Sequence, residues 1–316
     1  MATLIPKPIC RQAEHLKSAG LQSQILVPAD PEYVAREESY WSNSAKLHPA
    51  CIVRPRSAEE VSTAVKALVA AGEKFAVRSG GHTQRQGSNN IDGGVTIDLS
   101  LLNQTVYDAD SETASIGPGG RWLEVYTELH KFGRVVAGGR EGNVGVAGLL
   151  LGGGNTFFTA QRGFACDSVV EYEVVLADGR IVKADQDNNS DLFRVLKGGS
   201  NNFGIVTNFK MSALKCDKVW GGMTFCSKDV IPAALEATYN FTNNVPDDVN
   251  SNLVCLLTYL PDFKDLVVAS FYANVAGVVE PPIYKEWLEI PKMMSMVKMT
   301  SISEMTFEYN TPAQYQ

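Results

Sequence analysis

The chain has 316 residues, a formal net charge of −7 and 45% hydrophobic residues. This length and apolar content predict one large or two medium domains with a buried core, and they exclude a disordered chain. An acidic chain without a cluster of basic residues is not expected to bind nucleic acid or an anionic membrane surface.

Neither a membrane span nor a signal peptide is visible. The longest uncharged stretch, residues 142–161, contains six glycines and is a poor membrane helix. Near the N-terminus, Lys7, Arg11 and Glu14 interrupt any apolar run. We therefore expect a cytoplasmic location, with secretion as the open alternative, and no sequence pattern indicates the oligomeric state.

The six cysteines are too sparse for a disulfide scaffold, and no CxxC spacing supports a zinc site, so no metal is expected. Most of them are expected in strands or in the core. These are Cys166, Cys216, Cys226 and Cys255. Cys10 and Cys51 flank the first segment and can pair if the protein is secreted.

Glycine is distributed unevenly and marks the predicted domain boundaries. Eighteen of the 27 glycines lie between Gly72 and Gly154, and only three follow Gly204. After about residue 214 glycine nearly vanishes, whereas methionine becomes frequent. We therefore divide the chain into an N-terminal arm, a glycine-rich domain and a third part. The bounds are 1–44, 45–215 and 216–316.

Taken in chain order, residues 1–44 show no strong hydrophobic period. The first clear element is a helix over 57–71, because Ser57 and Glu60 form a capping box and Gly72 follows its end. Asp178-Gly179 predicts the turn of a β-hairpin. The remaining predicted elements are strands at 75–78, 95–99 and 114–116, a helix at 121–131, hairpin strands at 169–176 and 181–183, a helix at 191–196, and strands at 203–211, 253–259 and 267–275. This order favours an α+β fold without a regular βαβ repeat.

Four methionines stand close together near the C-terminus. They are Met293, Met294, Met296 and Met299. Methionine at helical spacing is more often core filler, which is the interpretation that we favour, but such a group can also line an adaptable binding surface.

Two glycine tracts stand out in the front of the chain, at 78–82 and 142–154. Clustered glycines let backbone N–H groups approach phosphate oxygens. Neither a P-loop nor a G-x-G-x-x-G motif after a strand is present. Two separate tracts favour a long dinucleotide held across a groove, whereas tight turns and close strand crossings are the alternative explanation. For His82, the alternative is an ordinary polar loop residue.

The ordered motifs resemble the FAD-binding domain of berberine bridge enzyme-type flavin oxidases, of the vanillyl-alcohol oxidase superfamily, and most of all its fungal members. The motifs are Arg54-Pro55, Arg78-Ser79-Gly80-Gly81-His82, Asp92 to Leu99, Gly117-Pro118-Gly119-Gly120, Gly152-Gly153-Gly154 and Lys197 to Thr207. The resemblance covers about residues 45–215. It implies a PCMH-type FAD-binding domain of two subdomains, followed by a partial α+β substrate domain with an antiparallel sheet.

The resemblance also implies which residues hold the cofactor. His82 matches the histidine that joins the 8α carbon of the flavin, residues 78–83 match a pyrophosphate loop, and 142–154 match a tract along the flavin. The implied FAD-binding residues are Arg78, Ser79, Gly80, Gly81, His82, Thr83, Gly87, Gly142, Val144, Gly145, Gly148, Gly153, Gly154, Ile205 and Val206.

Departures from the family pattern refine these expectations. Members with a second flavin bond carry cysteine where this chain has Glu141, so a single covalent link through His82 is expected. Val144 lies where a small side chain accompanies access of dioxygen, which favours an oxidase over a dehydrogenase. Gln84 and Asn155 replace common aromatic residues and leave the substrate open.

The implied function is hydride transfer from an alcohol, amine or related C–H bond of a small organic substrate to FAD, with dioxygen as acceptor, in fungal secondary metabolism. Family members extend beyond residue 316 and carry their catalytic base there, so the chain looks C-terminally truncated and no base is assigned. Glu304 and Glu308 are expected on a solvated face. The alternatives are a truncated, noncatalytic FAD-binding protein or gene fragment, and a carbohydrate-binding module whose glycines are structural.

Overall fold

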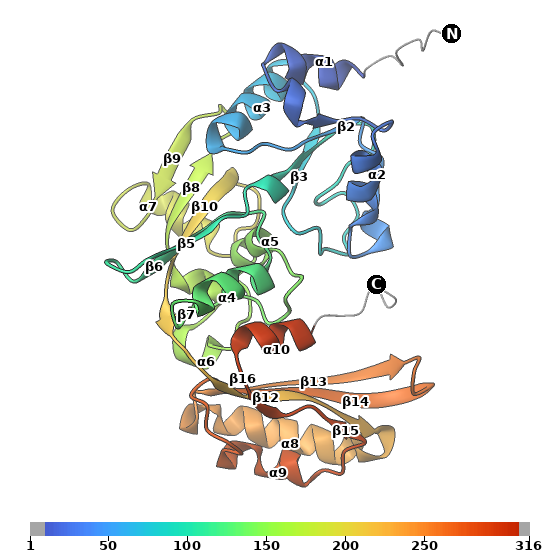
Figure 1. Ribbon diagram of the computed structural model, residues 1–316, viewed down its shortest axis with the longest axis vertical. Coiled ribbons are helices and arrows are strands. Elements are labelled where there is room, and N and C mark those ends of the chain that lie inside the picture. Colours follow the sequence, from blue (N-terminus) through green and yellow to red (C-terminus); the bar gives the residue numbers. More distant parts are fainter. Residues whose placement is uncertain (1–9, 310–316) are drawn as a thin grey trace.

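The computed structural model describes residues 10–309, and its three main β-sheets are stacked along the long axis of the molecule (Figure 1). The first two sheets lie in the predicted FAD-binding part except for β1, which comes from the predicted N-terminal arm, and the third is formed by residues after 215. The α+β fold class is confirmed. The predicted helices and strands are also present, with ends that differ by a few residues.

The first sheet has the strand order β1-β2-β4-β3, and both β2 and β3 run parallel to β4. Its strands are β1 (Ile25–Leu26), β2 (Cys51–Val53), β3 (Phe75–Arg78) and β4 (Val95–Asp98). The helices of this subdomain are α1 (Arg11–Ser18), α2 (Pro31–Glu38) and α3 (Ala58–Ala70). Buried residues of α1, α3, β2 and β4 form one apolar cluster.

The start of α3 confirms the predicted cap, with one difference in detail. Ser57 Oγ accepts a hydrogen bond from the backbone N–H of Glu60 at 3.3 Å. The Glu60 carboxylate reaches the backbone N–H of Arg56 at 2.7 Å, and it also accepts from Gln24 Nε2 at 2.8 Å. The cap therefore ties the helix to the segment that precedes β1 as well as closing its first turn.

Although residues 1–44 show no strong hydrophobic period in the sequence, the described residues 10–44 contain regular elements. They contain α1 and α2, and β1 pairs with β2 in the first sheet. Each helix has only eight residues, and α2 buries a tyrosine and a glutamate, Tyr33 and Glu37. Helices this short, with polar buried residues, carry little apolar periodicity.

The second sheet is antiparallel, with the order β5-β6-β10-β8-β9. Its strands are β5 (Thr105–Asp108), β6 (Thr113–Ile116), β8 (Val169–Val175), β9 (Ile181–Ala184) and β10 (Ile205–Ser212). The β8–β9 pair confirms the hairpin predicted at Asp178-Gly179. The nearby elements are α4 (Trp122–His130), α5 (Val146–Leu151), α6 (Thr159–Arg162), α7 (Ser190–Leu196) and the pair β7 (Arg134–Val135) with β11 (Leu214–Lys215).

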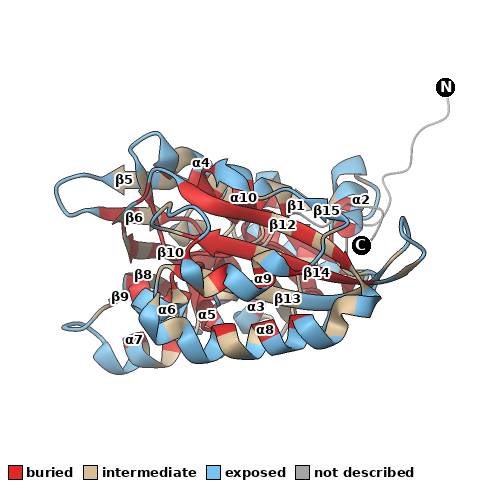
Figure 2. Ribbon diagram, turned by 90° about the horizontal axis from the view of Figure 1, so that it is seen from below, coloured by how far each residue is buried: buried red, intermediate tan, exposed pale blue. Residues whose placement is uncertain are grey.

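The third sheet is antiparallel and carries helices on its outer face, where Figure 2 shows α8 with an exposed side turned away from β12 and β14. Its elements are β12 (Val219–Ser227), β13 (Ser251–Leu260), β14 (Asp265–Asn274), β15 (Met294–Ser295), β16 (Lys298–Thr300), α8 (Ile231–Asn244) and α9 (Lys285–Glu289). On the other side, α10 (Ile302–Glu308) packs between this sheet and α4.

The interpretation of the four methionines as core filler is wrong. Met293, Met294, Met296 and Met299 are 37–48% exposed and lie on or beside the edge strands β15 and β16. The local structure is extended, so the helical spacing in the sequence has no structural counterpart here.

The cysteines are free thiols, and Cys10 donates to the carbonyl of Ala50 at 3.3 Å while Cys51 is buried. Burial raises the pKa of the Cys51 thiol. Within residues 10–309, no helix combines the length and apolar character needed to cross a membrane.

Candidate active site

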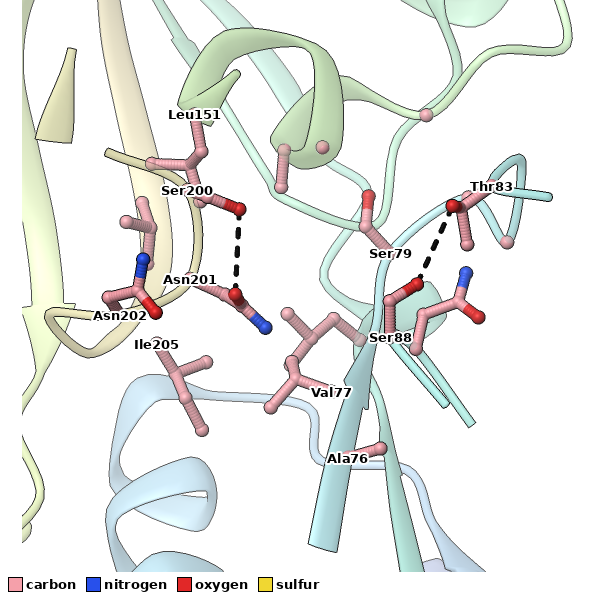
Figure 3. Close-up of a pocket in the computed structure, with 18 of the residues that line it drawn as sticks. Ala76, Val77, Ser79, Thr83, Ser88, Leu151, Ser200, Asn201, Asn202 and Ile205 are labelled. Atoms are coloured by element: carbon pink, nitrogen blue, oxygen red, sulfur yellow. Dashed lines mark hydrogen bonds between the residues drawn. The ribbon is translucent and has the colours of Figure 1, made fainter. Parts of the chain in front are cut away.

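A cavity of about 1110 Å³ separates the first two sheets, at the ends of β3 and β10. In Figure 3, Ala76, Val77, Ser79 and Thr83 lie on one side and Ile205 with the preceding loop on the other. Pockets for small ligands are usually about 300–1,000 Å³. This cavity is therefore large enough for an extended, dinucleotide-sized ligand.

Most of the residues implied by the family resemblance line this cavity. They are Ser79, Gly80, Gly81, His82, Thr83, Gly87, Val144, Gly145, Gly148, Ile205 and Val206. They come from three stretches that are far apart in the sequence, namely the loop after β3, the start of α5 and the start of β10. Folding thus brings both glycine tracts to one site.

The two glycine tracts touch through their backbones. A Cβ atom at Gly80 would lie 2.5 Å from Gly145 Cα and 2.6 Å from Gly145 N, so neither position has room for a side chain. Arg121 bridges the same two segments, because its guanidinium donates to the carbonyl of Gly80 at 3.0 Å and to that of Asn143. Burial lowers the pKa of Arg121, but a guanidinium remains charged in proteins.

Arg78 supports the first tract from behind and does not line the cavity. Its side chain is fully buried and donates to the carbonyl of Arg36 at 2.6 Å and to Ser39 Oγ at 2.8 Å. The guanidinium also stacks 3.7 Å from the ring centre of Tyr40. Burial lowers the pKa of Arg78. These contacts fix the end of β3 against α2 and thereby fix the direction of the loop.

Three further glycines of the second tract lie outside the cavity lining. The N–H of Gly142 donates to the carbonyl of Thr306 in α10 at 3.1 Å. Gly153 and Gly154 have φ values of +94° and +82°, and their carbonyls accept from Cys166 at 2.9 Å and Ala165 at 2.8 Å. They form the turn that ends α5, a conformation that favours glycine.

The loop before β10 supplies cavity residues that were not singled out from the sequence. They are Ser200, Asn201 and Asn202. Ser200 has a φ of +61°, and its N–H donates to the carbonyl of Leu151 at the end of α5 at 2.9 Å. The motif Lys197 to Thr207 could have identified them, because it contains this loop as well as the start of β10.

His82 lies at the wall of the cavity between an aromatic ring and a carboxylate. The indole of Trp41 stacks on the imidazole, with ring centres 4.7 Å apart and an angle of 21° between the planes. Trp41 is held there because its backbone N–H donates to the carbonyl of Gly81 at 3.0 Å. Glu141 also lies beside the imidazole, with its Oε2 atom 3.5 Å from His82 Nε2.

Glu304 and Glu308 have structural contacts away from this cavity. Glu304 completes the N-terminal capping box of α10, and its carboxylate accepts from Thr300 Oγ1 at 2.8 Å, which lowers the pKa of that carboxyl. Glu308 pairs with Lys298 at 2.6 Å. Neither residue lines the cavity at the glycine tracts.

Comparison with known proteins explains this combination of fold and site. Residues 49–185 match the sequence profile of the FAD binding domain. The chain is 41% identical over 299 residues to the FAD-dependent monooxygenase drtC of Aspergillus calidoustus, a match that covers 93% of this chain and 57% of drtC. The chain therefore contains an FAD binding domain and is similar in sequence to a fungal FAD-dependent oxidoreductase.

Solved structures of oxidases share the fold at low sequence identity. 6-Hydroxy-D-nicotine oxidase of Arthrobacter nicotinovorans is 24% identical with a TM-score of 0.82, and the match covers 91% of this chain and 64% of that chain. Glucooligosaccharide oxidase of Acremonium strictum, described as carrying 6-S-cysteinyl, 8α-N1-histidyl FAD, is 23% identical with a TM-score of 0.79, covering 96% and 64%. The chain thus spans between about half and two thirds of the length of these proteins.

Proposed function

We propose that this chain is the FAD-holding part of an oxidase that removes a hydride from an alcohol, amine or related C–H bond of a small organic substrate. The observation that carries this proposal is the cavity where Gly80 meets Gly145 beside His82. Its size suits FAD, and its glycines leave backbone N–H groups open to an anionic ligand.

The residues of the cavity have distinct roles in this proposal. The backbone of 79–83 holds the pyrophosphate, since N–H groups without side chains in the way can reach its oxygens. Ile205 and Val206 give an apolar wall at the start of β10. His82 forms the covalent bond to the 8α carbon. This bond is the single one, because the position of a second link is occupied by Glu141, which cannot act as a thiolate nucleophile.

Bound FAD would supply hydride acceptance at its N5 atom, and a histidyl substituent at 8α makes the flavin a better acceptor. The chain itself positions FAD and excludes water from it. Val144 lines the cavity three residues after Glu141, at the position where, in the family that the sequence resembles, a small side chain accompanies access of dioxygen. We therefore propose dioxygen as the acceptor and hydrogen peroxide as its product.

Turnover measurements test this function. The purified, FAD-loaded chain is mixed without oxygen with panels of alcohols, amines and sugars, and bleaching of the flavin absorbance is followed. We expect bleaching by at least one class and, after oxygen is admitted, one hydrogen peroxide per substrate oxidised. Incorporation of ¹⁸O from labelled dioxygen into the product would show that the reaction is that of a monooxygenase and not of an oxidase. A chain that binds FAD but is reduced by none of these classes favours the noncatalytic alternative.

A further inference from the structure

Glu141 is placed against the histidine that the proposed function links to FAD. Its Oε2 atom lies 3.5 Å from His82 Nε2, and the two side chains are 21% and 29% exposed. Oε2 itself is shielded from solvent and accepts no hydrogen bond within residues 10–309. A buried carboxylate oxygen without a hydrogen bond costs free energy. An imidazole N–H that is directed at Oε2 lowers this cost.

The surroundings hold His82 in place and put a positive charge near Glu141. Trp41 covers one face of the imidazole and stabilises the ring plane in which Nε2 can face Glu141. The guanidinium of Arg121 is close enough to interact electrostatically with the Glu141 carboxylate. Since Arg121 is itself fixed by the carbonyls of Gly80 and Asn143, its charge is a permanent part of the site.

The geometry selects one of the two nitrogens of His82. In a neutral imidazole, the nitrogen that faces a carboxylate carries the proton, and the other nitrogen carries the lone pair. Because Nε2 faces Glu141, Nδ1 is the nucleophilic nitrogen. A positive charge that develops on the ring during attack is then stabilised by the carboxylate beside it.

We propose that Glu141 is a positioning residue for flavin attachment, which orients His82 through Nε2 and accepts the Nε2 proton as Nδ1 forms its bond to FAD. This inference rests on the proposed covalent link. Glu141 stands at the position where members with a second flavin bond carry cysteine. In this chain, the residue at that position would instead promote the bond through His82.

The step balances with dioxygen as the oxidant. A bond forms between His82 Nδ1 and the 8α carbon, while one C–H bond of the 8-methyl group and the imidazole N–H bond break. The imidazole proton passes to Glu141 and on to solvent, which the partly exposed carboxylate can reach, and the proton of the 8-methyl group is also released to solvent. The two electrons enter the flavin ring and are passed to dioxygen, which takes up two protons and leaves as hydrogen peroxide.

The test follows covalent incorporation separately from binding. The full chain is produced under riboflavin limitation and mixed with FAD in air, and samples are taken over time. Total bound FAD is measured after desalting, and linked FAD is measured as flavin fluorescence that survives acid precipitation and denaturing electrophoresis. The variants are Glu141→Gln, which keeps the size, Glu141→Asp, which keeps the charge, and Glu236→Gln, a control on the exposed face of α8.

We expect Glu141→Gln to bind FAD but to form the covalent bond ~100-fold more slowly, in the range that a positioned proton acceptor contributes. Glu141→Asp should restore part of the rate, and Glu236→Gln should match the parent chain. If Glu141→Gln does not fold, Glu141→Ala with added formate replaces it, and formate should accelerate linking.

Linking of Glu141→Gln at the parental rate would overturn the inference, as would equal loss in Glu141→Asp or no effect of formate on Glu141→Ala. Failure of the proposed function gives a different pattern. In that case the parent chain itself binds no FAD or releases all of it in acid, which overturns the link and the role of Glu141 together.

Discussion

The contact between the two glycine tracts predicts that Gly80→Ala damages the FAD site. The added methyl group would lie 2.5 Å from Gly145 Cα, whereas ordinary contacts begin near 3.4 Å. One tract therefore has to move by nearly an ångström. Overpacking of this kind costs about 2 kcal/mol.

This cost can appear in two measurable quantities. If the tracts stay together in the FAD-free chain, the thermal midpoint falls by a few degrees. If they separate, the midpoint is unchanged and closing them again weakens FAD binding by up to ~30-fold. The thermal midpoint is followed by circular dichroism. Affinity is followed by quenching of flavin fluorescence in a His82→Ala background, where binding is an equilibrium.

Gly148→Ala is the matched control, because Gly148 also lines the cavity but has no atom within 4 Å of an added Cβ. It lies in the first turn of α5, so alanine should leave the FAD-free chain as stable as before, or more stable by up to ~1 kcal/mol. The reasoning is refuted if Gly80→Ala changes neither the thermal midpoint nor the FAD affinity.

Two other substitutions test the supports of the site. Arg121→Lys removes the planar fork that reaches Gly80 and Asn143 together, and the lost charged hydrogen bond, about 1.5 kcal/mol, should weaken FAD binding ~10-fold in the same titration. An unchanged affinity would show that this bridge is dispensable. Burial raises the pKa of the Glu37 carboxyl, so the fold loses stability as rising pH ionises it. The thermal midpoint of Glu37→Gln minus that of the parent should therefore increase from acidic to neutral pH. A difference that does not change with pH would contradict this.

Local signals made much of the fold predictable. The cap at Ser57 and the turn at Asp178-Gly179 depend on neighbouring residues, and the structure confirms both elements. The helices within 1–44 were missed because their stability comes from packing and not from their own pattern, as for Tyr33, whose hydroxyl donates to the carbonyl of Pro49 at 2.7 Å.

The site was predictable as a set of motifs but not as a geometry. Glycine chemistry and the family resemblance indicated the tracts around His82, yet a sequence cannot distinguish a glycine that faces a cavity from one that ends a helix, such as Gly153. Arg121 and Trp41 were missed as site residues because their roles come from contacts across the fold, with Gly80 and with the ring of His82.

Acid precipitation of the purified chain tests the central claim most directly. We predict a yellow protein whose flavin stays in the pellet, and whose visible spectrum is that of an oxidised flavin. In His82→Ala, the same treatment should release all flavin into the supernatant. A colourless parent chain, or flavin that is fully released by acid from the parent, would contradict a covalent flavin site at His82.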